Sequence, residues 1–254
     1  MRTLRQLIIQ YPLVSFFILT YILSWWAVSF TGGQLLPYGP PMAALILIVL
    51  NEGRAGFRRL WQQRMAWSVV WWWLLIAPGM IIALHLGALL LNLLLGAHIV
   101  LPISLRLSLL IELIVVGGVW EELGWSGYAL PRLQARFAQQ PYGLLQASLV
   151  LGVFRAIWHV PLAVYGRIPW IDVFVFSIAF QLIISWLYNR SRGSVAVTML
   201  FHLTNNIFFG VVMSSLFTGS DHTRYYLIFV GLACLTAVFL MRLQTDNSQL
   251  AEAV

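Results

Sequence analysis

Charged residues are scarce in this chain of 254 residues: they make up only 9% of it, and lysine is absent altogether. Hydrophobic residues make up 61%, and the mean hydropathy is +0.86. A soluble domain of this length needs far more polar residues to cover its surface. The composition therefore excludes a soluble globular protein and predicts one integral-membrane domain over residues 1–254.

Cysteine is nearly absent as well, because Cys234 is the only one in the sequence. A disulfide framework and a cysteine-based zinc site are both excluded. The net charge of +7 comes entirely from arginines that lie mostly between apolar segments. A nucleic-acid-binding protein would need a contiguous basic face, so we expect no nucleic-acid partner.

Long apolar runs fill most of the chain. A helix that crosses a bilayer needs roughly 20 mostly apolar residues, and about eight segments qualify. The sequence therefore predicts an all-α, polytopic membrane helix bundle surrounded by lipid. The candidate spans are 11–31, 37–51, 68–95, 109–130, 143–165, 170–189, 194–216 and 224–242.

The arginines are distributed unevenly between the two sides of such a bundle. With eight spans and a cytoplasmic N-terminus, only Arg106, Arg155, Arg167 and Arg224 fall outside the cytoplasmic side. Short cytoplasmic loops carry an excess of basic residues. The pattern predicts a multi-pass protein of the cell membrane with both termini in the cytoplasm.

Two adjacent acidic residues, Glu121 and Glu122, interrupt the apolar span 109–130. A charged side chain at the centre of a span costs about 2.5–3.5 kcal/mol on insertion scales, so it normally faces a polar site inside the bundle. Adjacent residues on a helix point about 100° apart, whereas Glu122 and Ser126 share a face. One glutamate is thus expected to react and the other to orient.

Two later spans each carry a histidine, His159 in 143–165 and His202 in 194–216, and Asn206 follows His202 by one helical turn. Carboxylate, imidazole and amide groups are those needed to activate water and to stabilise an oxyanion. The set predicts hydrolysis of a peptide bond. Intramembrane Glu and His also form proton relays, which leaves a proton-coupled transporter as an alternative.

In order and spacing these residues resemble the motifs of the CAAX-protease and bacteriocin-processing (CPBP, or Abi) intramembrane proteases. Those motifs are E-E-x-x-x-R, an aromatic followed by x-x-x-H, and H-x-x-x-N or D. The resemblance covers roughly residues 105–215. It implies an intramembrane endopeptidase acting on a membrane-associated protein or peptide.

The resemblance also implies a role for each matching residue. Glu121 and His159 would activate the water, His202 and Asn206 would stabilise the oxyanion, and Glu122 would hold the site together. The family has also been described as metalloproteases, in which case Glu121, His159 and His202 would ligate zinc. Two imidazoles and a carboxylate are an acceptable zinc set, and the sequence does not decide between a zinc ion and no cofactor.

Two positions depart from the family motifs. Ser126 stands where the first motif has arginine, and Arg155 stands where the second has an aromatic residue. Because Arg155 lies one turn before His159, we predict that it pairs with Glu122 and replaces the missing cation. The alternative is a decayed, non-catalytic site that binds membrane peptides or partner proteins, in which Arg155 pairs with Glu121 and blocks water. Asp172, at the start of a span, is interpreted as an N-terminal helix acid.

Overall fold

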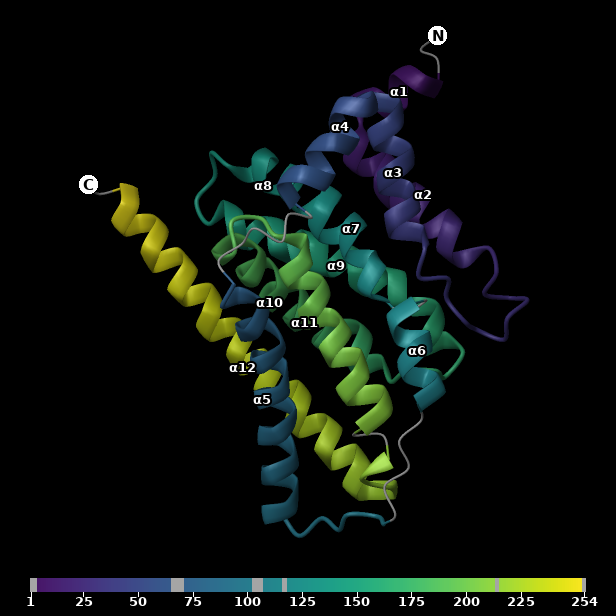
Figure 1. Ribbon diagram of the computed structural model, residues 1–254, viewed down its shortest axis with the longest axis vertical. Helices are drawn as coiled ribbons and strands as arrows, with labels where there is room; N and C mark the ends of the chain where they lie inside the picture. Colours follow the sequence, from purple (N-terminus) through teal and green to yellow (C-terminus); the bar gives the residue numbers. More distant parts are fainter. Residues whose placement is uncertain (1–3, 65–70, 102–106, 116–117, 213–214, 253–254) are drawn as a thin grey trace.

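The computed structural model describes residues 4–64, 71–101, 107–115, 118–212 and 215–252, and throughout these ranges every regular element is a helix (Figure 1). The predicted all-α class is confirmed. In chain order the elements are α1 (Leu4–Gln10), α2 (Pro12–Trp25), α3 (Gly39–Asn51), α4 (Gly53–Arg59), η1 (Leu60–Arg64), α5 (Trp73–Leu94), α6 (Leu107–Val115), η2 (Gly118–Trp120), α7 (Glu121–Gly124), η3 (Trp125–Ala129), α8 (Leu130–Phe137), α9 (Gly143–Val164), η4 (Asp172–Phe176), α10 (Ser177–Arg190), α11 (Val195–Ile207), η5 (Phe208–Val212) and α12 (Gly219–Glu252).

Four helical segments are long and apolar enough to cross a membrane: Trp73–Leu94, Gly143–Val164, Asp172–Arg190 and Gly219–Gln244. Three shorter apolar helices, Pro12–Trp25, Gly39–Asn51 and Val195–Val211, correspond to further predicted spans. The chain is thus a membrane helix bundle, while the count of about eight spans stays a prediction. Helix α1 and the later part of α12 lie toward the same end of the molecule (Figure 1).

The predicted span 109–130 is not one continuous helix. Helix α6 ends at Val115, and after residues 116–117, which lie outside the described part, the chain continues through η2, α7, the π-helical turn η3 and α8. The sequence here contains Gly117, Gly118, Gly124 and Gly127, and glycine weakens helices by about 1 kcal/mol per residue relative to alanine. Hydropathy over the span therefore did not reveal that the described segment from Gly118 to Phe137 changes between 3₁₀-, α- and π-helical geometry.

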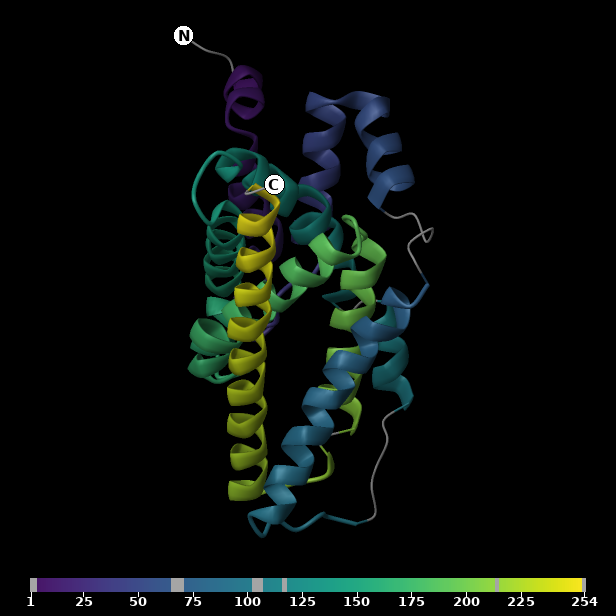
Figure 2. The same ribbon diagram turned by 90° about the vertical axis from the view of Figure 1, so that its left-hand side faces the viewer.

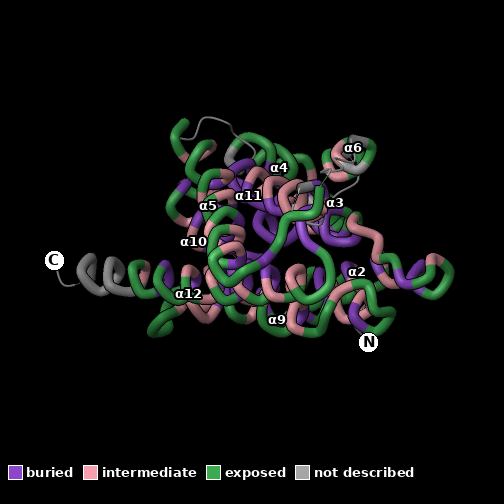
Figure 3. The backbone as a smooth tube through the Cα atoms, turned by 90° about the horizontal axis from the view of Figure 1, so that it is seen from below, coloured by how far each residue is buried: buried purple, intermediate pink, exposed green. Residues whose placement is uncertain are grey.

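Two apolar cores flank the middle of the molecule. The first joins α5, α10, α11 and α12 and includes Phe180 and Phe201; the second joins α2, α3, η3, α8 and α9 and includes Trp125 and Trp158. Viewed from below, the buried backbone gathers toward the middle of the bundle (Figure 3), and α12 runs along one face of it (Figure 2). The buried charged residues Glu122 and Arg155 lie on α7 and α9, next to the boundary between these cores.

Gly124 allows α7 to approach α3 closely. A Cβ atom added at Gly124 would overlap the backbone carbonyl of Pro40, whereas one added at Gly231 of α12 meets nothing within 4 Å. Small residues commonly permit such contacts between membrane helices. The close approach brings the C-terminal end of α7 against the N-terminal end of α3.

We therefore expect Gly124→Ala to destabilise the protein by about 1–3 kcal/mol, the usual cost of overpacking. The matched variant Gly231→Ala should be neutral or slightly stabilising, because it adds helix propensity without a clash. Thermal unfolding of the two variants in detergent measures the difference. Equal melting temperatures would show that the α3–α7 contact can relax at no cost.

Candidate active site at the junction of four helices

The glutamate pair lies on the short helix α7, with Glu122 fully buried and Glu121 nearly so. Ser126, one turn later in η3, donates its hydroxyl hydrogen to Glu122 Oε2. Trp125 Nε1 donates to Glu121 Oε2 at 3.4 Å. The prediction that Glu122 and Ser126 share a helix face is confirmed, and the two carboxylates have separate partners.

Arg155 of α9 is the buried cation at this junction, with an exposure of only 1%. Its Nη2 atom lies 2.6 Å from Glu122 Oε1 and 3.6 Å from Glu121 Oε2. Its Nη1 atom donates to Gln181 Oε1 of α10 at 3.0 Å, and Gln181 in turn donates to Ser185. The predicted Arg155–Glu122 ion pair is confirmed, so the arginine points into the bundle and not into lipid.

His202 of α11 completes the contacts around the same guanidinium. Its Nδ1 atom lies 2.9 Å from Glu122 Oε1 and 3.1 Å from Arg155 Nη2. A guanidinium only donates hydrogen bonds and a carboxylate only accepts them, so a neutral His202 can hydrogen-bond to just one of them through Nδ1. The partner that Nδ1 bonds therefore determines whether His202 Nε2 carries a hydrogen or a lone pair.

His159 has no such ambiguity. Its Nδ1 atom lies 2.9 Å from the backbone carbonyl oxygen of Arg155, one turn earlier on α9. Because a carbonyl oxygen can only accept, Nδ1 carries the hydrogen, and the neutral ring presents the lone pair of Nε2. That atom is free to accept a proton from water.

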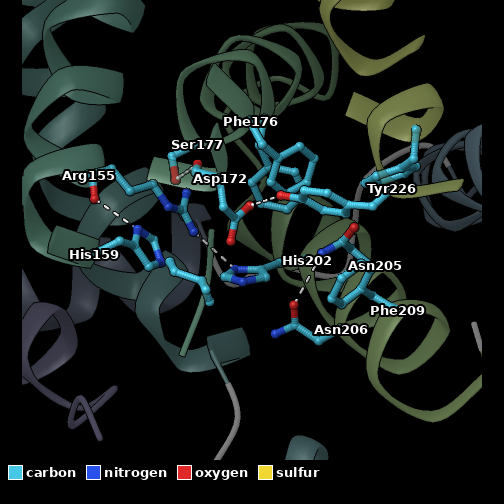
Figure 4. A pocket seen from close by; sticks show the side chains of 13 residues that line it. Arg155, His159, Asp172, Phe176, Ser177, His202, Asn205, Asn206, Phe209 and Tyr226 are labelled. Carbon is cyan, nitrogen blue, oxygen red and sulfur yellow. Dashed lines mark hydrogen bonds between the residues drawn. The ribbon is translucent and has the colours of Figure 1, made fainter. Parts of the chain in front are cut away.

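A cavity of about 200 Å³ adjoins these groups, and His159, His202, Asn206 and Arg155 line it (Figure 4). Asn205 also lines it and donates its Nδ2 hydrogen to Asn206 Oδ1 at 3.3 Å. Neither glutamate is among the lining residues. The predicted site residues thus fall into two adjoining groups, with Arg155 and His202 common to both.

Sequence reasoning missed several polar residues at this junction. Gln181 binds Arg155, and Asp172 and Tyr226 line the cavity and are hydrogen-bonded to each other. Gln181 and Ser185 stand one turn apart in an apolar run, a spacing that could have marked them as a buried polar pair. The Asp172–Tyr226 contact joins residues 54 positions apart, and no local pattern predicts it.

Comparison with known proteins supports the resemblance seen in the sequence. The type II CAAX prenyl endopeptidase Rce1-like family matches residues 102–208. CAAX prenyl protease 2 of Methanococcus maripaludis is 30% identical over 106 residues. Residues 102–208 thus resemble a CAAX prenyl endopeptidase, in agreement with the motifs in the sequence. The match to the Methanococcus maripaludis protein covers 37% of the chain and 37% of the relative, so the activity of the whole protein is a matter for proposal.

The zinc set considered for the CPBP family does not fit this arrangement. Across the described ranges, no three His, Cys, Asp or Glu side chains are grouped so as to hold a metal ion. The Arg155 guanidinium contacts both Glu121 and His202, two of the three predicted ligands. A fixed positive charge there opposes a dication at the same place.

The ion pair can be tested by moving the cation back to the position that the CPBP motif gives it. Arg155→Ala leaves the Glu122 carboxylate buried and unpaired, and breaking a buried pair costs about 3–5 kcal/mol. Adding Ser126→Arg should recover much of the lost stability and activity. Arg58→Ala, which removes an exposed arginine on α4, is the control and should change neither.

Thermal unfolding in detergent and peptide cleavage measure both effects. A silent Arg155→Ala variant, or a double variant no better than the single one, would contradict the compensation between the two positions.

Proposed function

We propose that this protein is an intramembrane endopeptidase that hydrolyses a peptide bond of a membrane-associated protein or peptide. The observation that carries the proposal is the orientation of His159, whose Nδ1 hydrogen is bound by a carbonyl while its ring lines a cavity shared with His202 and Asn206. Together with the resemblance of residues 102–208 to CAAX prenyl endopeptidases, this arrangement suits activation of water beside a scissile bond. Both termini are assigned to the cytoplasm from the distribution of arginines.

In the proposed mechanism, His159 Nε2 takes one proton from water as the water oxygen attacks the carbonyl carbon of the peptide bond, and Glu121 assists in activating this water. The tetrahedral intermediate carries a negative oxygen, which His202 Nε2–H and the Asn206 amide stabilise. The proton then passes to the departing amine as the carbon–nitrogen bond breaks. Each donor to such an oxyanion contributes about two to three orders of magnitude in rate.

This role for His202 requires a hydrogen on Nε2. In the neutral ring, Nδ1 must then accept from Arg155 Nη2, which lies 3.1 Å away. Arg155 therefore acts as a positioning residue: it neutralises Glu122 and selects the His202 tautomer that can donate to the oxyanion. Glu122, bound by Ser126 and Arg155, holds these groups in place.

One contact favours a second candidate function. Arg155 Nη2 lies 3.6 Å from Glu121 Oε2, close enough to pair with this carboxylate and to compete with water for it. A protein in that state would bind membrane peptides without cleaving them. The two candidates differ in product formation and not in binding, so a cleavage assay separates them.

Cleavage of a membrane-peptide library by purified protein tests the proposed residues. Glu121→Gln, His159→Ala and His202→Ala should each lower the rate by at least about a hundredfold, because each removes proton transfer or oxyanion stabilisation. His98→Ala is the matched control, because the His98 side chain is exposed and does not belong to the proposed site. A wild-type protein that binds the peptides and yields no products would favour the non-catalytic candidate.

Metal dependence is a separate measurement. We expect full cleavage activity after exhaustive dialysis against a chelator, because Arg155 already provides the cation between the predicted zinc ligands. Loss of activity that returns on addition of Zn²⁺ would overturn this expectation. Such a result would leave the endopeptidase proposal intact.

A further inference from the structure

Asp172 places a carboxylate in the wall of the cavity opposite the two histidines. It is the first residue of η4, and its half-buried side chain lines the cavity together with His159 and His202 (Figure 4). Its Oδ1 atom accepts a hydrogen bond from the Tyr226 hydroxyl at 2.7 Å. The side chain is thus held at the cavity and does more than cap a helix.

This carboxylate has no cationic partner among the described residues, because none of the ion pairs that they form includes Asp172. Arg155, which also lines the cavity, is bound to Glu122 and Gln181. A carboxylate within a membrane bundle is costly unless it is paired, and the neutral Tyr226 hydroxyl supplies one hydrogen bond only. The second oxygen remains available to a ligand.

Most of the other side chains that line the cavity are aromatic. They include Phe176, Phe180, Phe209 and Phe229. A cavity of roughly 150 Å³ can hold a benzene ring, so the volume of about 200 Å³ found here accommodates one long side chain. Aromatic faces also attract cations, by about 0.5–2 kcal/mol.

We propose that Asp172, held by Tyr226, forms a specificity subsite that receives a lysine or arginine side chain of the substrate beside the scissile bond. The methylene stem packs against the phenylalanine rings, and the cationic tip reaches the carboxylate. Because His159 and His202 line the same cavity, a side chain seated there brings the adjoining peptide bond to them. The inference rests on the proposed endopeptidase function.

Peptides that differ at a single position test the subsite. Cut sites of the wild-type protein in a membrane-peptide library should be enriched in Lys or Arg at one position next to the cleaved bond. For a matched pair with Lys or norleucine at that position, kcat/KM should favour Lys by about tenfold to a hundredfold, the value of one charge-assisted hydrogen bond. Asp172→Asn should remove this preference while cleavage of the norleucine peptide continues.

Tyr226→Phe should reduce the preference less than Asp172→Asn, because it removes the support of the carboxylate and not its charge. Asp221→Asn is the matched control: this aspartate also lies near a helix start but pairs with Arg224 and does not line the cavity. An equal kcat/KM for Lys and norleucine peptides in the wild type, or a preference that survives Asp172→Asn, would overturn the proposal.

Binding of the matched Lys and norleucine peptides, each with an acetylated N-terminus and an amidated C-terminus, can be followed by tryptophan fluorescence. This measurement tests the subsite independently of cleavage. If the wild-type protein cleaves nothing but binds the Lys peptide more tightly, and Asp172→Asn abolishes the difference, the subsite stands while the endopeptidase proposal fails. If both peptides bind the wild type equally and neither is cleaved, both proposals fail.

Discussion

A buried guanidinium, that of Arg155, governs the arrangement of the central helices. It binds Glu122 of α7, Gln181 of α10 and the imidazole of His202 on α11. Removing an ion from water costs several kcal/mol, which is repaid only when its hydrogen-bonding groups find well-placed partners. The four helices are therefore held to one mutual orientation, because a shift in any of them would leave a charge or a polar group buried without a partner.

The same constraint explains why the site lies between two apolar cores. Packing of leucine and phenylalanine tolerates many arrangements of similar volume, whereas the ion pair has one good geometry. The ring centroids of Trp125 and Phe180, one residue from each core, lie 5.9 and 5.5 Å from the guanidinium carbon of Arg155. The aromatic rings shield the pair from lipid and add a favourable interaction with the cation.

Much of this arrangement could be predicted from the sequence. Hydropathy indicates the helical class, and the cost of a charge in hydrocarbon is enough to predict that Arg155 pairs with Glu122. Both inferences rest on large free-energy terms that do not depend on the details of side-chain packing. The contact between Glu122 and Ser126 was likewise expected, because residues one turn apart on a helix are neighbours.

The rest could not be predicted, because it depends on weaker or non-local effects. The short 3₁₀ helix η2 and the π-helical turns η3, η4 and η5 depart from regular α-helix over a few residues, which hydropathy averaged over many residues does not resolve. Such turns often occur at functional sites. The pairing of Asp172 with Tyr226 arises from the packing of η4 against α12, a contact between distant parts of the chain.

The location of the cation also constrains the order in which the two unusual residues can have been acquired. If an ancestor had the family arginine at position 126 and an aromatic residue at position 155, two routes lead to the present chain. Losing the first arginine before gaining the second leaves the Glu122 carboxylate without a counter-ion, at a cost of about 3–5 kcal/mol. Gaining Arg155 first places two cations beside Glu121 and Glu122, which balances the charge. The second route keeps Glu122 paired at each step, so a relative that carries both arginines is the expected evolutionary intermediate.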